Sequence, residues 1–600
     1  MKGKKIKAGI SRYSILIWIL FALWGCEKQN SSETDSGEGG RNLYEAYVAI
    51  NLHMLEESEV RSNPTGGEDG DGKEPGLDNE NAIKNLTVLF YPGNDINSSL
   101  NTPVEYILYV DETDIIGTTT RVQKIQLDRA IYHLIVIANA GDLSLDLYGK
   151  TVQEVCDYIQ HNAWTLTGGN YSDFIMTSAA DESIDLITKT SENNPATATV
   201  EIQRIAARID IIPNAGDNAT NTYSIVENGE TLAQVTVRKG KLVNRLTAGS
   251  YLIKRTASTV GGTPVYMGNE TPASGVQTNY VIDPWTAIKT KANLSGGHFN
   301  LVEGGSGTDV ASGLYANYFD SSFSLGAEDA LQQPISGKDF YILDYTLENT
   351  MYKDNQVNGY STGITYETVY LPLKITNYNA SSIKNEIINN TDVITFFATT
   401  ENLVVYNSLE AIAAVSLAPN QPDDFFSHTF TTANTWGELQ EYMQRLSDND
   451  RLGFKAYLEI LLLDKTLTNH LTQEVSWKQF ILSNYGFSQN GNTITINQNG
   501  LDTKQVFNQQ GIKMYEEGLC YYTYWIRHSN DNTIDSAIME FAIVRNNIYK
   551  LQIVSFSALG KPEPFNPGTD DPENPDEESY ITLVITVKPW RLRTHPEIIL

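Results

Sequence analysis

The chain has 600 residues and a formal net charge of −30, with 43 Lys and Arg against 73 Asp and Glu. Nucleic-acid phosphates require a basic surface, so this balance argues against nucleic acid as a partner. Charged residues make up only 19% of the chain, whereas Tyr occurs 33 times. This composition is typical of an extracellular β-protein rather than a cytosolic enzyme, and the length allows several domains.

The N-terminus has the features of an export signal. A basic leader precedes an apolar run from Ile15 to Trp24, and Gly25 follows. This pattern predicts a signal peptide over residues 1–25. Cleavage before Cys26 gives an arrangement similar to the lipobox of bacterial lipoproteins, in which this cysteine carries the lipid. The run is too short to span a bilayer comfortably, so we expect a lipid-anchored chain, with an uncleaved membrane anchor or a buried helix as the alternative.

An isolated strand is predicted close to this anchor. Residues 27–81 are rich in Ser, Gly, Glu, Asp and Asn, which predicts a linker. Within it, the stretch 44–54 alternates apolar and other residues, as an amphipathic strand does. Its predicted apolar face consists of Tyr44, Ala46, Val48, Ile50, Leu52 and Met54. Arg61 and Ser62 follow at the start of a Gly-rich acidic stretch, where proteases cut readily.

The region from about Ala82 to Ser557 contains strand-like runs separated by Gly, Asn and Pro. Such runs at short spacing predict a mainly β fold built from β-sandwiches. The runs lie at residues 83–91, 132–140, 197–212, 234–237, 341–345, 403–406 and 541–544. Helical patterns are predicted at 151–161 and at 435–463, the second as a pair of helices in an insertion.

The C-terminal tail carries a second isolated strand. Residues 561–579 are rich in Pro and acidic residues, which predicts an extended spacer. The predicted strand at 580–590 follows, ending at Trp590, and one of its faces carries Ile581, Leu583, Ile585 and Val587. A strand on a linker is unstable alone, because its backbone groups and apolar face lack partners. Either both strands pair with sheet edges of their own chain, or the tail strand of one molecule fills a groove left by the first strand of another.

Catalytic and metal-binding patterns are absent from the sequence. No hydrolase, metalloprotease or phosphate-loop motif occurs, so we expect no enzymatic activity, no cofactor and no metal. His133, His161 and His528 lack a neighbouring acid or nucleophile and are interpreted as structural. The aromatic cluster 521–525 is interpreted as core rather than as a sugar platform. The two remaining cysteines, Cys156 and Cys520, are interpreted as buried free thiols, with one disulfide as the alternative.

Several segments resemble a known family. They are 521–528, 539–549 and the closing Val587-Lys588-Pro589-Trp590, with similar patterns at 84–88, 136–141, 174–178, 206–209, 347–350 and 361–364. Through these segments the chain, most strongly after Gly518, resembles the major fimbrial subunits (fimbrillins) of Bacteroidales type V pili, and the short-fimbria major subunit type most of all.

The resemblance implies an architecture and a role. It implies two transthyretin-like β-sandwich domains, at 62–250 and 251–560, the second with a helical insertion near 435–465. It implies a pilus shaft subunit that polymerises with copies of itself, assembles with minor tip and anchor pilins, and supports adhesion and biofilm formation. The precursor would sit in the outer membrane through its lipid before the subunit joins a cell-surface fimbrium.

The resemblance also implies a route of maturation. An arginine-specific, trypsin-like protease would cut between Arg61 and Ser62 and remove residues 26–61 with the first strand. The donor strand and tail, residues 580–600, would then fill the groove of the next subunit. Arg41 is the competing cut site, but cutting there would leave the first strand in place. Two other functions stay open: a surface lipoprotein that binds a glycan or host ligand without polymerising, and a tip or anchor subunit of the same pilus.

Overall fold

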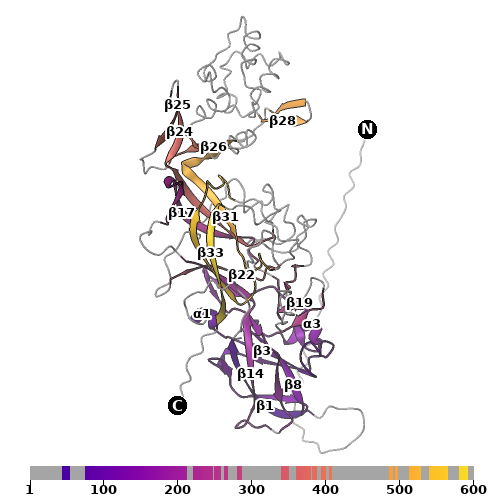
Figure 1. The fold of residues 1–600 in the computed structure, drawn as a ribbon. Coiled ribbons are helices and arrows are strands. Elements are labelled where there is room, and N and C mark those ends of the chain that lie inside the picture. The colour runs from indigo at the N-terminus through magenta and orange to yellow at the C-terminus, as the bar shows by residue number, and fades with distance from the viewer. Residues whose placement is uncertain are drawn as a thin grey trace, which may run out of the picture. The chain divides into compact units, whose positions relative to one another are not determined.

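The computed structural model describes residues 43–54, 74–188, 190–212, 221–246, 249–257, 262–267, 280–286, 339–350, 360–379, 382–387, 394–399, 405–407, 486–490, 493–497, 512–528, 539–564 and 580–591. Over these ranges the protein is mainly β, which confirms the predicted fold class (Figure 1). The α-helices of the described ranges are α1 (Asp78–Asn81), α2 (Ser144–Leu147) and α3 (Val152–Cys156). The insertion predicted near 435–465 lies outside these ranges.

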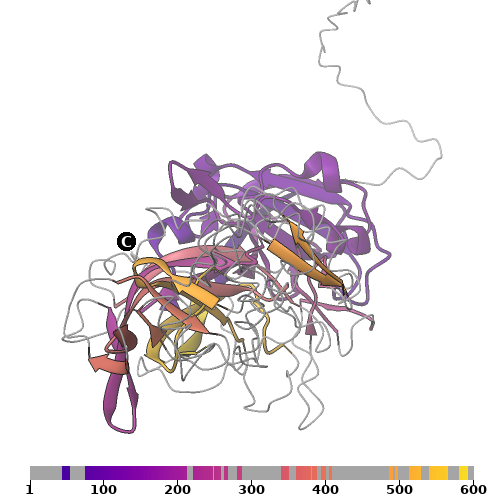
Figure 2. The ribbon, with the colours of Figure 1, turned by 90° about the horizontal axis from the view of Figure 1, so that it is seen from above.

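A ten-stranded sheet is formed by the N-terminal part of the described chain, and its strands are drawn in indigo and purple in Figures 1 and 2. The strands are β1 (Tyr44–Met54), β3 (Leu86–Pro92), β4 (Tyr106–Val110), β5 (Ile115–Ile116), β6 (Thr119–Thr120), β7 (Gln123–Leu127), β8 (Ile131–Ala138), β12 (Met176–Ser178), β13 (Glu182–Asp185) and β14 (Ala196–Arg204). Their order is β4-β3-β8-β12-β14-β1-β6-β5, with β13 beside β8 and β7 beside β1.

The central strands of this sheet are buried on both faces. In β3, Leu86, Val88 and Phe90 belong to one hydrophobic cluster, whereas Leu89 and Tyr91 belong to another. Successive residues of a strand point to opposite faces, so each face of β3 packs against its own core. Burial on both faces explains why this strand and β8 are continuous apolar runs in the sequence.

Two further sheets form a β-sandwich. The first has the order β2-β33-β32-β15-β22 and the second the order β16-β17-β23-β31. The bounds are β2 (Glu74–Pro75), β15 (Ala206–Ile211), β16 (Thr222–Glu227), β17 (Glu230–Val243), β22 (Tyr341–Leu347), β23 (Gly363–Pro372), β31 (Leu519–Trp525), β32 (Asn547–Phe556) and β33 (Ile581–Arg591). Side chains of both sheets, such as Ile209, Val235 and Tyr366, share one hydrophobic cluster, as the facing layers of a sandwich do. The transthyretin-like type remains a prediction.

Shorter strands complete the described structure. They are β9 (Ile159–Gln160), β10 (Thr165–Thr167), β11 (Asn170–Ser172), β18 (Ser250–Tyr251), β19 (Arg255–Ala257), β20 (Val265–Tyr266), β21 (Tyr280–Val281), β24 (Lys374–Asn379), β25 (Ser382–Ile387), β26 (Phe396–Thr399), β27 (Val405–Tyr406), β28 (Gly486–Asn490), β29 (Thr493–Asn497) and β30 (Ile512–Tyr515). They form small sheets, for example β25-β24-β27-β26-β30.

The single strand predicted at 197–212 is two strands that belong to different sheets. The chain leaves the ten-stranded sheet at Arg204, bends at Ile205 and enters the sandwich at Ala206. Asn546 holds this bend from both sides: its Oδ1 accepts a hydrogen bond from Arg204 N at 3.2 Å, and its own N–H donates to Ala206 O at 2.8 Å. The domain boundary between residues 250 and 251 stays a prediction.

Two predicted elements were wrong in extent or type. The helix expected at 151–161 is only α3, and after it Ile159 and Gln160 pair with β18 instead. The strand expected at 541–544 is a turn with one isolated bridge, between Ile543 and Asn349. Residues with positive φ flank this stretch, Met539 at 63° and Asn546 at 58°, and a strand cannot continue through such residues.

Candidate assembly strands

The predicted first strand is an inner strand of the ten-stranded sheet. β1 has the predicted bounds and lies between β14 and β6. It runs parallel to β14, with Val48 opposite Ala196 and Met54 opposite Ile202. It runs antiparallel to β7, with Tyr44 opposite Leu127. In this structure β1 therefore pairs within its own chain, as the first alternative expects, but as an inner strand with neighbours on both sides rather than at a sheet edge.

The apolar face of β1 is buried in the core of its sheet. Val48 and Ile50 are fully buried, Leu52 is 3% exposed and Ala46 is 7% exposed. Tyr44, predicted on the same face, is 41% exposed at the start of the strand. Burying the three larger side chains stabilises the sheet by roughly 5–9 kcal/mol. Loss of β1 would therefore open a deep apolar groove in this sheet.

Backbone groups of β1 also have specific partners outside the strand ladder. Ile50 N–H donates to Thr120 Oγ1 at 3.0 Å and Leu52 N–H donates to Thr118 O at 2.8 Å. Tyr47 N–H donates to Thr190 Oγ1 at 2.7 Å. These acceptors stay with the sheet if β1 leaves, and an extended segment taking its place could use them again.

Charged side chains meet β1 at both of its ends. At the start, Lys124 Nζ lies 2.6 Å from Glu45 Oε1, and the Arg129 guanidinium lies 4.6 Å from the centroid of the Tyr44 ring. At the end, His53 Nε2 lies 3.0 Å from Glu201 Oε1. The charged residues of the sheet beside β1 thus differ in sign: Lys124 and Arg129 are cationic where β1 begins, and Glu201 is anionic where it ends.

The predicted donor strand is the outermost long strand of its own described sheet. β33 pairs antiparallel with β32, from Ile581 opposite Phe556 to Pro589 opposite Asn547. On its other side, β2 pairs with Trp590 and Arg591. Ile581 and Leu583 are buried, at 4% and 7% exposed, and Ile585 is half-buried against the same cluster. The side chains of Val587 and Trp590 lie outside the described set.

A buried ionic cluster holds the segment that precedes β3. The Arg208 guanidinium donates to both Glu80 oxygens, at 2.9 and 3.2 Å, and to Asp210 and Glu74. Tyr345 O–H donates to Glu80 at 2.5 Å, and all these groups are buried. Residues 74–81 are thereby fixed to the sandwich, independently of β1.

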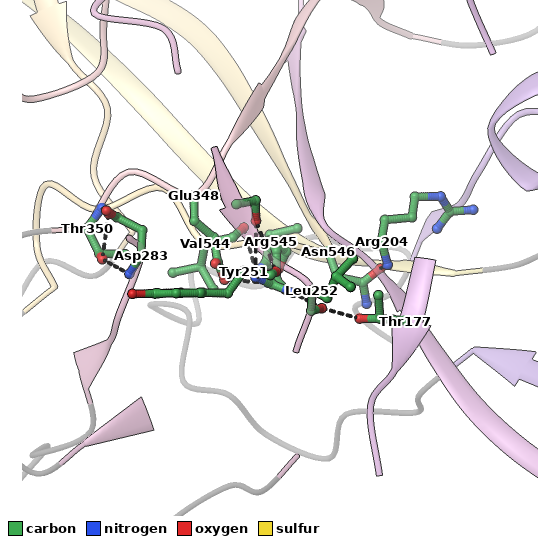
Figure 3. A network of polar contacts seen from close by, with 12 residues as sticks. Thr177, Arg204, Tyr251, Leu252, Asp283, Glu348, Thr350, Val544, Arg545 and Asn546 are labelled. Atoms are coloured by element: carbon green, nitrogen blue, oxygen red, sulfur yellow. Dashed lines mark hydrogen bonds and ion pairs between the residues drawn. The ribbon is translucent and has the colours of Figure 1, made fainter. Parts of the chain in front are cut away.

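A second polar network centres on Arg545, within a segment that the sequence singled out by resemblance (Figure 3). Its guanidinium forms a bidentate ion pair with the Glu348 carboxylate, with both N···O distances at 2.7 Å. It also donates to the carbonyl oxygens of Tyr251 and Leu252, at 2.8 and 3.0 Å. Leu252 O in turn accepts from Thr177 Oγ1 of β12 at 2.7 Å. Arg545 thus links the sandwich to the ten-stranded sheet.

The two cysteines of the described ranges are buried thiols. Cys156 and Cys520 are free and buried, as the favoured interpretation stated. Burial raises the pKa of Cys156 to about 12 and that of Cys520 to about 11, so both stay protonated at neutral pH.

The predicted core role of residues 521–525 is confirmed, since Tyr521, Tyr522 and Trp525 are buried. His528 is also buried, and its Nδ1 lies 2.8 Å from the Tyr549 hydroxyl. His133 Nδ1 lies 2.7 Å from Asp181 Oδ2, which explains its presence within a strand. His161 is exposed.

Cys26, Arg61 and Ser62 lie outside the described residues, so the lipidation and cleavage sites stay predictions. Within the described ranges, no group of His, Cys, Asp and Glu side chains is arranged to hold a metal ion. Of the helices in the described part of the chain, none is long and apolar enough to cross a membrane.

The fold and these strands define a mainly β protein, and sequence comparison shows which family two parts of the chain resemble. Residues 46–233 match the family described as major fimbrial subunit protein (FimA). Residues 513–595 match the family described as major fimbrial subunit protein type IV, fimbrillin, C-terminal. These two parts of the chain are therefore similar to major fimbrial subunits. The first match contains β1 from Ala46 onward and the second contains β33.

Solved structures give more distant likenesses. A fimbrilin from Porphyromonas gingivalis W83 has a TM-score of 0.33 and 12% identity, covering 92% of this chain and 99% of its own. The tip fimbrial protein Mfa3 from Porphyromonas gingivalis has a TM-score of 0.28 and 10% identity, covering 91% and 100%. Because these scores are low, the likeness to major fimbrial subunits rests on the two sequence matches. Among curated proteins, no relative matches the sequence significantly.

Proposed function

We propose that the chain is a shaft subunit of a pilus, exported as a lipoprotein acylated at Cys26 and matured by cleavage between Arg61 and Ser62. Cleavage releases residues 26–61 with β1, and β33 of another copy enters the vacated position. The role is structural rather than catalytic, and adhesion and biofilm formation would depend on the resulting fibre. The short-fimbria type, the outer-membrane precursor and the arginine-specific protease belong to this proposal.

One observation carries the proposal: the strand ahead of the cut is an inner strand of a sheet, and the tail offers a matching one. β1 and β33 are both 11 residues long. Four buried positions of β1 alternate along the strand, and Ile581, Leu583, Ile585 and Val587 alternate in the same way. With Ile581 in the place of Ala46, Val587 takes the place of Leu52. Each apolar side chain of β33 then falls on a buried position.

The same register matches the charge at the end of the groove. It puts Lys588 in the place of His53, which contacts Glu201 at 3.0 Å. A lysine cation would thus replace a histidine opposite the same carboxylate. A shift of two residues in one direction puts Pro589 on one of the four buried positions. A shift of two residues in the other direction leaves one of these positions without an apolar side chain. The register with Ile581 at Ala46 is therefore favoured.

The groove left by β1 offers β33 a large apolar burial. There β33 would bury four apolar side chains, worth on the order of 6–12 kcal/mol before ordering costs and before the loss of its present pairing with β32 is subtracted. It would also gain ladder partners on both edges, where β14 and β7 now pair with β1. Because proteolysis removes β1 permanently, the incoming β33 does not compete with β1 for the groove.

The proposal is tested by sequencing the N-terminus and measuring the oligomeric state of the surface-exposed protein. Wild type is compared with Arg61→Ala and with a chain truncated after Glu578. We expect a mature N-terminus at Ser62 and SDS-resistant ladders that both variants lose. An acylated Cys26 retained in the surface protein, with monomers in all three samples, would contradict the proposal.

A further inference from the structure

Two cations of the ten-stranded sheet have partners that the proposed maturation removes. Lys124, in β7, contacts Glu45 at 2.6 Å, and Arg129, two residues after β7, covers the ring of Tyr44 at 4.6 Å. Glu45 and Tyr44 both belong to β1, within the predicted propeptide. Lys124 and Arg129 remain on the sheet, and both are exposed.

Removal of β1 therefore changes the charge at the start of the groove. Lys124, Asp128 and Arg129 together are balanced by Glu45 in the precursor. We call these three residues the rim of the groove. Without Glu45 the rim carries a net positive charge, and the Arg129 guanidinium no longer covers an aromatic ring. Exposed cations carry little burial cost, so the rim would attract an anionic chain rather than disturb the fold.

The segment that must pass this rim is strongly acidic. The spacer directly ahead of β33 contains Asp570, Asp571, Glu573, Asp576, Glu577 and Glu578. It contains no Lys or Arg between Pro562 and Ser579. When β33 takes the direction and register of β1, Glu578 occupies the place of Leu43. Glu577 then falls opposite Arg129 by extension of the β1–β7 register, in which Tyr44 is opposite Leu127.

We infer that Lys124 and Arg129 form a docking site for the acidic spacer of the incoming subunit. The inference rests on the proposed strand exchange and adds that the acidic spacer is the segment that binds the rim. The site is masked by Glu45 and Tyr44 in the precursor and uncovered only by maturation. It directs the entering chain to the correct end of the groove, since Glu201 at the other end repels the acidic spacer and attracts Lys588.

The test uses protease-matured, full-length subunit and two synthetic peptides, residues 566–591 and 580–591. Binding rates are measured by stopped-flow fluorescence at 20 mM and 500 mM NaCl. We expect the longer peptide to associate roughly three- to tenfold faster than the shorter one at low salt, with the difference lost at high salt. The variant Lys124→Gln with Arg129→Gln should remove this advantage, so that the two peptides associate with it at the same rate. Lys150→Gln is the matched control, because Lys150 forms an equally exposed pair, with Glu154, away from β1.

The outcomes separate this inference from the proposed function. Equal rates for the two peptides, or an advantage that survives in the double variant, would overturn the docking site while strand binding itself stands. Failure of both peptides to bind the matured subunit would instead overturn strand exchange. A charge swap gives a second check: Glu577→Lys with Glu578→Lys in the long peptide should slow association with wild type, and Lys124→Glu with Arg129→Glu should restore it.

Discussion

Ile50 offers a substitution whose effect should depend on the maturation state. Ile50 is fully buried in β1, and replacing a buried Ile by Ala costs about 2–5 kcal/mol. With a urea dependence of about 2–3 kcal/mol/M for the sheet, Ile50→Ala should lower the unfolding midpoint of the precursor by about 1–2 M. The mature polymer should be unchanged, because the strand that carries the substitution has left.

Val200 supplies the matched control for this experiment. It is fully buried in β14, directly opposite Leu52, and it stays in the sheet after maturation. Val200→Ala should therefore weaken both the precursor and the polymer, by about 1–3 kcal/mol. Unfolding followed by intrinsic fluorescence, together with the SDS resistance of assembled ladders, reports the two states. If Ile50→Ala weakened the polymer as much as Val200→Ala, β1 would still be in the fibre and the reasoning would be refuted.

Three further predictions concern the buried polar groups. Arg545→Ala should destabilise precursor and mature protein by about 3–5 kcal/mol in thermal unfolding, because it leaves the Glu348 carboxylate buried and unpaired. Glu80→Ala should cost a similar amount and speed proteolysis within residues 74–81, because Arg208 loses the buried partner that fixes these residues to the sandwich. Burial lowers the pKa of His528 from 6.5 to about 4, so the unfolded chain binds the extra proton and stability falls as pH drops from 6.5 to 4; His528→Gln should remove about 3 kcal/mol of that loss in urea unfolding.

Each of these has a distinct control or contrary result. Glu112→Ala removes an exposed ion pair with Lys84 and should change stability by less than about 1 kcal/mol, which calibrates the Glu80 result. An Arg545→Ala protein with an unchanged melting temperature would show that the network in Figure 3 is not stabilising.

The hydrogen-bond pattern supports a neutral His528: Tyr549 Oη accepts from Val544 N–H at 2.8 Å, which leaves its own proton for His528 Nδ1. Equal acid sensitivity of wild type and His528→Gln would contradict this.

The strands at the two ends of the chain could be predicted because their patterns are local. A period-2 alternation fixes which face of a strand is buried wherever it pairs, so the bounds of β1 and its face from Ala46 to Leu52 follow from the sequence. Its position inside a sheet could not be predicted, because that depends on partners about 150 residues away, such as Ala196.

Other features depend on contacts that no local pattern encodes. The bend at Ile205 requires the side chain of Asn546, and without it the apolar run from 197 to 212 has the form of one strand. The ionic cluster gave one local signal, the charged Arg208 and Asp210 two residues apart within a buried run. Their third partner, Glu80, lies in a stretch whose composition predicts a linker. Lys124 and Arg129 became informative only when the structure placed them against β1.

The central claim is that β33 of one subunit occupies the place of β1 in another, and cross-linking tests it most directly. Subunits carrying only Glu201→Cys are mixed with subunits carrying only Lys588→Cys, matured and oxidised. Neighbouring strands lie about 4.8 Å apart, within reach of a disulfide, and the buried native thiols do not compete. We predict a cross-linked dimer that requires both variants and appears only after cleavage at Arg61. No dimer in matured, assembled fibres, or an equal yield from uncleaved precursors, would contradict the account.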